Sequence, residues 1–120
     1  MEQQHLSDSE YRLLQVVWAS EPVASGQLVT LCGERLGWKK STTYTVLKKL
    51  CDKGVLRNQG STVTSAVPRA AVDHRAAEAF VDKTFGGSLP GFLTAFMGGR
   101  KLTAKEAEDL KRLIETYQEG

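Results

Sequence analysis

The sequence is poor in the residues that build catalytic, metal and disulfide sites. Its 120 residues include two cysteines, Cys32 and Cys51, and two histidines, His5 and His74. The cysteines lack the paired spacing of a zinc site or a disulfide framework, so each is expected to be a small buried apolar residue. The histidines are isolated, expected in the terminal segment and at an exposed helix start, and there is neither a glycine-rich phosphate loop nor a nucleophile with a neighbouring base. We therefore expect no enzyme, no cofactor and no metal.

Long apolar runs are also missing. No stretch approaches the roughly 20 apolar residues of a membrane span, and the polar start MEQQHLSDSE has no signal-peptide core. Hydrophobic residues make up 41% and charged residues 25% of the chain, which is ordinary for a soluble globular protein. We expect a cytoplasmic protein without membrane contact, built as one domain or as a small domain with an appended interaction element.

The charge is small in total but unevenly placed. The formal net charge is +2, yet residues 1–70 carry nine cations and six anions, and the remainder carries seven cations and eight anions. Six of the cations and a single anion fall between Lys39 and Arg57, which gives this segment a charge of +5. A basic front half with a near-neutral back half is typical of nucleic-acid binding in front and protein contact behind.

The basic segment reads as a helix with two different faces. Ser41 or Thr42 is placed to cap it, and Gly54 to end it in a left-handed turn. One face is apolar and the other carries hydroxyls and ammonium groups; the two sets are Val46, Leu47 and Leu50, and Thr42, Thr45, Lys48 and Lys49. A DNA-recognition helix needs short hydroxyls for base edges and cations for phosphates. An ordinary solvated basic helix is the alternative interpretation.

Two helices are predicted before this segment. Ser7 and Glu10 have the spacing of a capping box, which places a first helix at about residues 9–20, ended by Pro22. A second helix is expected from Ser25 to Gly37, and the short connection to the basic helix then forms a helix-turn-helix. The predicted inward residues of the two helices are Tyr11, Leu14, Val17, Trp18, Leu28, Leu31, Cys32 and Leu36.

After Gly54 the pattern indicates a β-hairpin. Residues 55–57 and 62–68 read as strands, with residues 58–61 as the loop between them. A hairpin directly behind a recognition helix is a wing. The predicted fold class is therefore mainly α with a small β-hairpin wing: a winged helix-turn-helix domain over residues 1–69, followed by a C-terminal helical dimerisation domain over residues 70–120.

The back of the chain predicts three short helices. The first ends at Gly86-Gly87, the second runs from Ser88 to Gly98-Gly99, and Thr103 caps the third with Glu106 three residues on. Helices this short leave a sizeable apolar surface, which a second copy of the chain would cover. The predicted dimerisation residues are Phe80, Phe85, Leu89, Phe92, Phe96, Leu110, Leu113, Ile114 and Tyr117.

The arrangement resembles the BlaI/MecI/CopY family of bacterial repressors. The matching stretches are LSDSEYRLLQVVW, STTYTVLKKLCDKGVL, the wing that ends in Val67-Pro68, FGGSLPGFLTAF and LTAKEAEDLKRLIE, so that the likeness runs from about His5 to Tyr117. The resemblance implies a homodimer that binds a palindromic double-stranded DNA operator and represses transcription. It implies base and backbone contacts by Ser41, Thr42, Tyr44, Thr45 and Lys49. With our own analysis of the faces and the flanking cations, the predicted DNA-binding residues are Lys40, Ser41, Thr42, Tyr44, Thr45, Lys48, Lys49 and Arg57.

The chain departs from the family pattern in three places. Family wings usually carry basic and aromatic residues, but NQGSTVTSAV is neutral and has no aromatic residue, which leaves Arg57 as the predicted wing contact. Copper-responsive members end in a paired cysteine motif, and here no cysteine follows Cys51. The β-lactam branch is inactivated by a regulatory protease at an Asn-Phe bond, and the matching bond here is Ala95-Phe96, with the Phe but not the Asn.

Two other functions stay open at this point. The chain can be a winged-helix module that contacts protein instead of DNA, in which case weak DNA binding would show little salt dependence. It can also be a redox- or metal-responsive regulator that acts through Cys32 and Cys51, provided the two thiols are close together and accessible.

Overall fold

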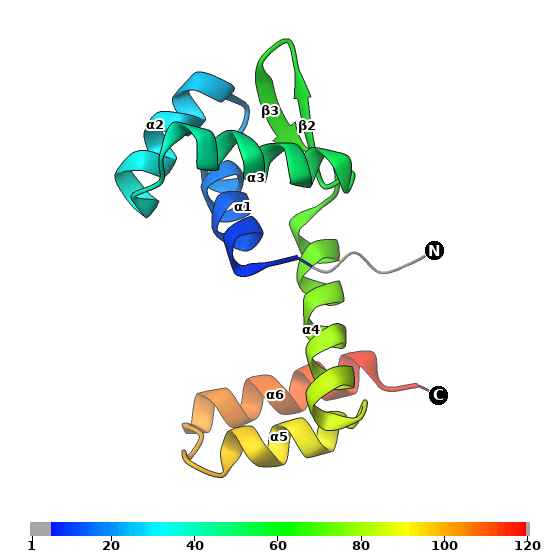
Figure 1. The fold of residues 1–120 in the computed structure, drawn as a ribbon. Coiled ribbons are helices and arrows are strands. Elements are labelled where there is room, and N and C mark those ends of the chain that lie inside the picture. The colour runs from blue at the N-terminus through cyan, green and yellow to red at the C-terminus, as the bar shows by residue number, and fades with distance from the viewer. Residues whose placement is uncertain (1–5, 120) are drawn as a thin grey trace. The chain divides into compact units, whose positions relative to one another are not determined.

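The computed structural model describes residues 6–119, so the predicted position of His5 lies outside the described residues. Helices and three short strands follow one another along this range (Figure 1). The chain forms two compact units, the first ending at Ala77 and the second beginning at Glu78. The elements are α1 (Asp8–Ser20), β1 (Val23–Ala24), α2 (Ser25–Leu36), α3 (Lys40–Asp52), β2 (Leu56–Gln59), β3 (Thr62–Ser65), α4 (Arg69–Phe85), α5 (Leu89–Met97) and α6 (Ala104–Tyr117). The predicted class, mainly α with a β-hairpin wing, is confirmed.

Helix α1 begins at the predicted capping box. The Glu10 amide donates to Ser7 Oγ at 3.2 Å, and the Ser7 amide donates to Glu10 Oε1 at 2.7 Å. These two bonds satisfy amides that have no partner inside the helix. The helix ends at Ser20, before Pro22. The sequence prediction for this helix is confirmed to within one residue.

Helix α2 ends where glycine allows it to. Gly37 adopts a left-handed conformation with φ of +70°, and its amide donates to the Gly33 carbonyl at 3.1 Å. The Trp38 amide donates to the Cys32 carbonyl at 3.3 Å, which closes the turn. A left-handed residue at this position reverses the chain with little steric cost only if it lacks a Cβ. The short turn leads directly into α3, as predicted for a helix-turn-helix.

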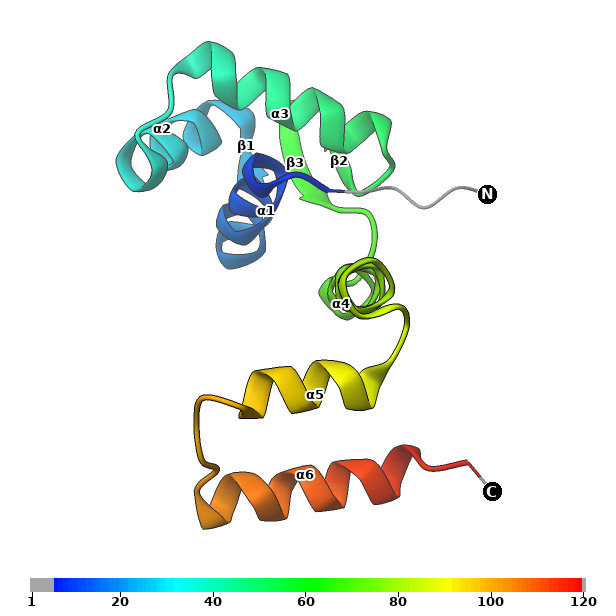
Figure 2. The same cartoon turned by 60° about the horizontal axis from the view of Figure 1, so that its bottom comes forward.

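The core of the first unit lies where α1, α2 and α3 meet the small sheet (Figures 1 and 2). Trp18 is half-buried against this core, and the guanidinium of Arg69 lies 4.7 Å from its ring centre. The start of α4 also belongs to this unit, because the Tyr11 hydroxyl donates to the Val72 carbonyl at 3.3 Å. The fully buried apolar side chains of the core are Leu13, Leu14, Val17, Leu28, Cys32, Leu50 and Val63.

The wing is a three-stranded antiparallel sheet in the order β1-β3-β2. Strand β1 was not predicted. It has only two residues, Val23 and Ala24, which pair with Val63 and Thr62 of β3. A two-residue strand has no periodic pattern of its own, and it forms here because β3 offers a free edge to the segment that joins α1 to α2.

The hairpin turn is tighter than the predicted four-residue loop. Strand β2 continues to Gln59, which pairs with Thr62, so that only Gly60 and Ser61 form the turn. Both have positive φ, +58° and +63°, as a type I′ turn requires. The prediction of residues 58–61 as the loop was wrong, because Asn58 and Gln59 are polar residues within a strand whose side chains reach solvent.

The second unit lacks a closed core. Phe80, Phe85 and Phe92 form a cluster of edge-to-face rings, with ring centres 5.6 to 6.0 Å apart, and Phe96 extends the cluster at 5.9 Å from Phe92. None of the side chains from Glu78 to Glu119 is fully buried. Helix α6 begins at the predicted capping box, in which the Glu106 amide donates to Thr103 Oγ1 at 3.0 Å.

Candidate nucleic-acid interface

Helix α3 begins at Lys40, earlier than a cap at Ser41 or Thr42 would place it. Its N-cap residue is Lys39, with φ of −75° and ψ of 157°, and no side chain caps the helix. The predicted cap by Ser41 or Thr42 was wrong, because the short turn after Gly37 already places Lys39 in the extended conformation of an N-cap. The hydroxyls of Ser41 and Thr42 are therefore not used by a cap and lie exposed in the first turn.

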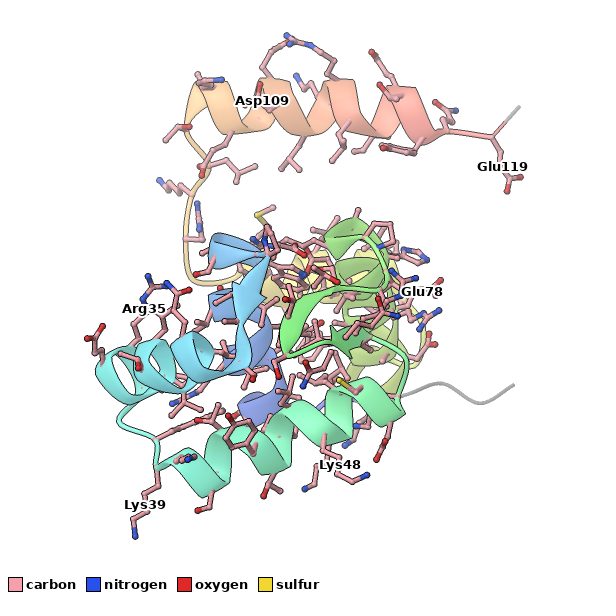
Figure 3. The ribbon with its side chains drawn as sticks, turned by 90° about the horizontal axis from the view of Figure 1, so that it is seen from above. Arg35, Lys39, Lys48, Glu78, Asp109 and Glu119 are labelled. Atoms are coloured by element: carbon pink, nitrogen blue, oxygen red, sulfur yellow. The ribbon has the colours of Figure 1, made fainter. Side chains whose placement is uncertain are left out.

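The faces of α3 are divided as the sequence predicted. Val46, Leu47 and Leu50 are buried in the core of the first unit. The remaining face is open to solvent, and Figure 3 shows Lys39 and Lys48 extending from it, away from the rest of the unit. The residues exposed on it are Lys40, Ser41, Thr42, Tyr44, Thr45, Lys48 and Lys49, and the exposed fraction of Tyr44 is 37%.

Thr43 is the residue of this helix that the sequence analysis missed. Its side chain is fully buried, and its hydroxyl donates to the Lys39 carbonyl at 3.3 Å. It lies three and four residues before Val46 and Leu47, and this helical spacing would have placed it on the inward face. Thr43 therefore fixes the first turn of α3 instead of facing the open side.

The cations of the segment do not all stay available. The ammonium of Lys53 lies 2.8 Å from the buried carboxylate of Glu10, and that of Lys48 lies 3.0 Å from Asp52 at the surface. The positive charge available on this face is therefore smaller than the sum of charges along the segment. The cations between residues 39 and 57 that form no ion pair with any residue from 6 to 119 are Lys39, Lys40, Lys49 and Arg57.

The Glu10 carboxylate belongs to the support of this face. Burial would raise its pKa, but the hydrogen bonds from Lys53 and Ser7 and the charge of Lys53 outweigh that effect, so the pKa of Glu10 is lowered. Glu10 is thus ionised at neutral pH although it is 3% exposed. It joins the first turn of α1 to the last turn of α3.

The wing contributes one cation. Arg57 lies on β2, is exposed, and pairs across the hairpin with Thr64 of β3. The turn of Gly60 and Ser61 carries no charge. Within the hairpin, Arg57 is the residue whose side chain carries a positive charge that can neutralise a phosphate.

Most of the predicted dimerisation residues are exposed on the second unit. Phe80 and Phe96 are each 51% exposed, and on α6 the exposure is 53% for Leu113, 60% for Ile114 and 79% for Tyr117. Leu89 is exposed as well, whereas Phe85, Phe92 and Leu110 are half-buried. The candidate cleavage bond, Ala95-Phe96, lies near the end of α5 with both side chains exposed, and its cleavage stays a prediction.

The two cysteines do not have the character of sensors. Cys32 is fully buried, and burial raises its pKa more than the neighbouring Thr43 and Arg35 lower it. Cys51 is half-buried, and burial together with the charge of Asp52 raises its pKa. Reactive and metal-binding cysteines need the thiolate, which both surroundings disfavour. Between residues 6 and 119 no group of His, Cys, Asp and Glu side chains is arranged to hold a metal ion.

A comparison with protein families shows the family to which the chain belongs. The sequence profile of the penicillinase repressor family matches residues 6–116. The chain belongs to this family. Its members are transcriptional repressors, which confirms both the resemblance described above and the expectation that the chain is not an enzyme. No helix in the described part of this repressor is both long and apolar enough to cross a bilayer.

Two relatives align with nearly the full repressor chain. It is 20% identical over 116 residues to the penicillinase repressor of Staphylococcus aureus, a match that covers 93% of this chain and 92% of the relative. It is 23% identical over 113 residues to an uncharacterised 16.5 kDa protein of Latilactobacillus sakei, covering 91% and 77%. The solution structure of monomeric Bacillus licheniformis BlaI with the blaP half-operator matches with a TM-score of 0.49 and 21% identity, covering 56% of this chain and 87% of that one.

Proposed function

We propose that this DNA-binding repressor acts as a homodimer that occludes a palindromic operator. We assign DNA binding to a domain of residues 1–69 and dimerisation to residues 70–120; the first compact unit itself continues through the start of α4 to Ala77. The observation that carries the proposal is the exposed face of α3, which presents hydroxyls and ammonium groups while its apolar face is held in the core. A helix of this kind fits the major groove of B-form DNA.

The exposed residues of α3 and of the wing fall into two groups by the length and charge of their side chains. Ser41, Thr42 and Thr45 have short hydroxyls that can hydrogen-bond to base edges only when the helix lies deep in the groove. Lys40, Lys49 and the wing residue Arg57 carry charges that neutralise phosphates on either side. Lys48 first has to exchange its surface ion pair with Asp52, which costs little because both side chains are mostly exposed. Tyr44, half-exposed beside them, completes the surface.

The open second unit supports the pairing of two copies. Its apolar side chains contact one another in the phenylalanine cluster, yet none from Glu78 onward to Glu119 is buried. A monomer would leave these side chains in water, and a two-fold pair would cover the same surface on both copies at once. Two-fold symmetry of the protein would then match two half-sites of a palindrome about one helical turn, or a multiple of it, apart.

A salt series tests the proposal. Fluorescence anisotropy is measured for a duplex from the promoter of the protein's own gene and for a scrambled duplex of equal composition. We expect affinity for the promoter duplex to exceed that for the scramble by roughly a thousandfold or more, with a steep loss of affinity as salt rises. Equal and weak binding to both duplexes with little salt dependence would contradict operator recognition and favour a protein-interaction module.

A further inference from the structure

The first unit contains a surface cleft between α1 and α2 that the proposed DNA contacts do not use. Its volume is about 570 Å³, which lies within the range of small-molecule sites in proteins. Val16, Leu36 and Tyr11 line it with apolar surface; Val16 is 4% exposed and the other two are half-buried. The Tyr11 hydroxyl is already bonded to the Val72 carbonyl, so the cleft offers a fixed apolar floor.

Two arginines also line the cleft. Arg12 comes from α1 and Arg35 from the last turn of α2, and neither forms an ion pair with a carboxylate anywhere from residue 6 to 119. Figure 3 shows Arg35 on α2, extending away from the side on which Lys39 and Lys48 project. Asp8, in the first turn of α1, is the lining carboxylate, so the lining carries a net charge of +1.

We propose that the cleft between α1 and α2 binds a small organic anion, with its carboxylate or phosphate on the guanidinium groups of Arg12 and Arg35 and its apolar part on Val16, Leu36 and Tyr11. A guanidinium presents paired N–H donors in a plane, which suits both oxyanions. Two of them next to an apolar floor select for a molecule that has both parts. Asp8 supplies an acceptor for a hydroxyl or ammonium donor on the same molecule.

The mixed lining of the cleft favours a small molecule over a nucleic-acid backbone. Contacts to DNA phosphates come from cations, hydroxyls and backbone amides, and they need no apolar surface beside them. Here the apolar floor and the charges line the same open cleft. The inference is independent of operator binding, because it concerns a different set of residues and a different class of ligand.

Backbone amide NMR of the full chain tests the site with three probes of similar size. Benzoate and phenyl phosphate carry the ring and an oxyanion, and benzyl alcohol carries the ring alone. We expect saturable chemical-shift changes for at least one of the two anions, clustered at residues 8–16 and 35–36, and none that saturate for benzyl alcohol. Benzoate binding alone would assign a carboxylate ligand, and phenyl phosphate binding alone a phosphate ligand.

Matched variants complete the test. The double variant Arg12→Gln/Arg35→Gln should raise the dissociation constant of the bound probe at least tenfold, since each change removes a charge but keeps a side chain of related shape. Arg75→Gln removes an exposed guanidinium from α4, outside the cleft lining, and should leave the constant unchanged. No saturable shift with either anion, equal saturation by benzyl alcohol, or unchanged binding in the double variant would overturn the proposal.

Discussion

The ammonium of Lys53 lies 2.8 Å from the carboxylate of Glu10, across 43 residues of sequence. The same carboxylate oxygen accepts the Ser7 amide, so one atom serves both the N-cap of α1 and the last turn of α3. Glu10 is buried and the Lys53 side chain is 26% exposed. The ion pair thus holds the end of the proposed recognition helix against the helix that supports it.

Glu10→Gln should lower the free energy of unfolding by about 2 kcal/mol, because the amide keeps the cap but loses the charge-assisted bond to Lys53. Urea unfolding followed by circular dichroism measures the change. Glu106→Gln is the matched control: Glu106 has the same capping role and also pairs with a cation, Arg100, but at the surface. A loss in the control as large as that in Glu10→Gln would show that the cap, and not the buried pair, is responsible.

The Glu10 pair also predicts how stability depends on pH. The pKa of Glu10 is lowered from its ordinary value of 4.5, so the unfolded chain takes up this proton first as pH falls. The stability that Glu10 contributes is therefore complete above 4.5 and is lost as pH falls through the lower folded pKa. The difference in unfolding free energy between wild type and Glu10→Gln should shrink below pH 4.5. A difference that stays constant down to pH 3 would mean that the carboxylate is not perturbed.

Thr45→Ala and Lys49→Ala should affect DNA binding in different ways. Loss of the Thr45 hydroxyl should reduce discrimination between promoter and scrambled duplex by about 1 to 3 kcal/mol, with the salt dependence unchanged. Loss of the Lys49 ammonium should weaken binding to both duplexes alike and reduce the salt slope by about 1. Anisotropy titrations at several salt concentrations separate the two effects. Equal behaviour of the variants would show that this face does not meet DNA as assigned.

Ile114→Asp should separate the proposed dimer. Ile114 is 60% exposed in the monomer, so the change is tolerated by the fold, but a paired copy would have to bury the new carboxylate. We expect a cost of about 2 kcal/mol or more, or roughly thirtyfold in the dimer dissociation constant by sedimentation equilibrium. Arg112→Asp, on the opposite face of α6, is the control and should leave the constant nearly unchanged. Equal dimer dissociation constants in the two variants would exclude the apolar face of α6, on which Ile114 lies, from the interface.

Ser61→Gly should stabilise the first unit by about 0.5 to 1 kcal/mol. Ser61 has φ of +63°, which strains any residue with a Cβ and suits glycine. Ser61→Val should destabilise by more than 1 kcal/mol, because a branched Cβ is the least compatible with this conformation. Thermal unfolding ranks the three proteins. The reverse order would mean that the turn rearranges when Ser61 is replaced.

The features predicted well from sequence are those that short segments determine. The capping boxes at Ser7 and Thr103, the glycine stop at Gly37 and the two faces of α3 all follow from residues three or four apart. The features that were missed depend on distant partners. Strand β1 forms by pairing with β3, and the charge of Lys53 is used in an ion pair with Glu10. The cleft is lined by Arg12 of α1 and Arg35 of α2, which are distant in sequence. No local pattern encodes such pairings.

The pairing of β1 with β3 has a mechanical consequence. The amide of Ser25, the first residue of α2, donates to the Ser61 carbonyl at the tip of the hairpin at 2.8 Å. At the base of the hairpin, the hydroxyl and the backbone amide of Ser65 both donate to the Glu21 carboxylate. The hairpin is therefore fastened at its tip and at its base to the segment that leads into α2. Movement of the hairpin away from this segment would break these hydrogen bonds. The exchange rate of the Ser25 amide proton with solvent therefore reports how often the hairpin separates from the start of α2.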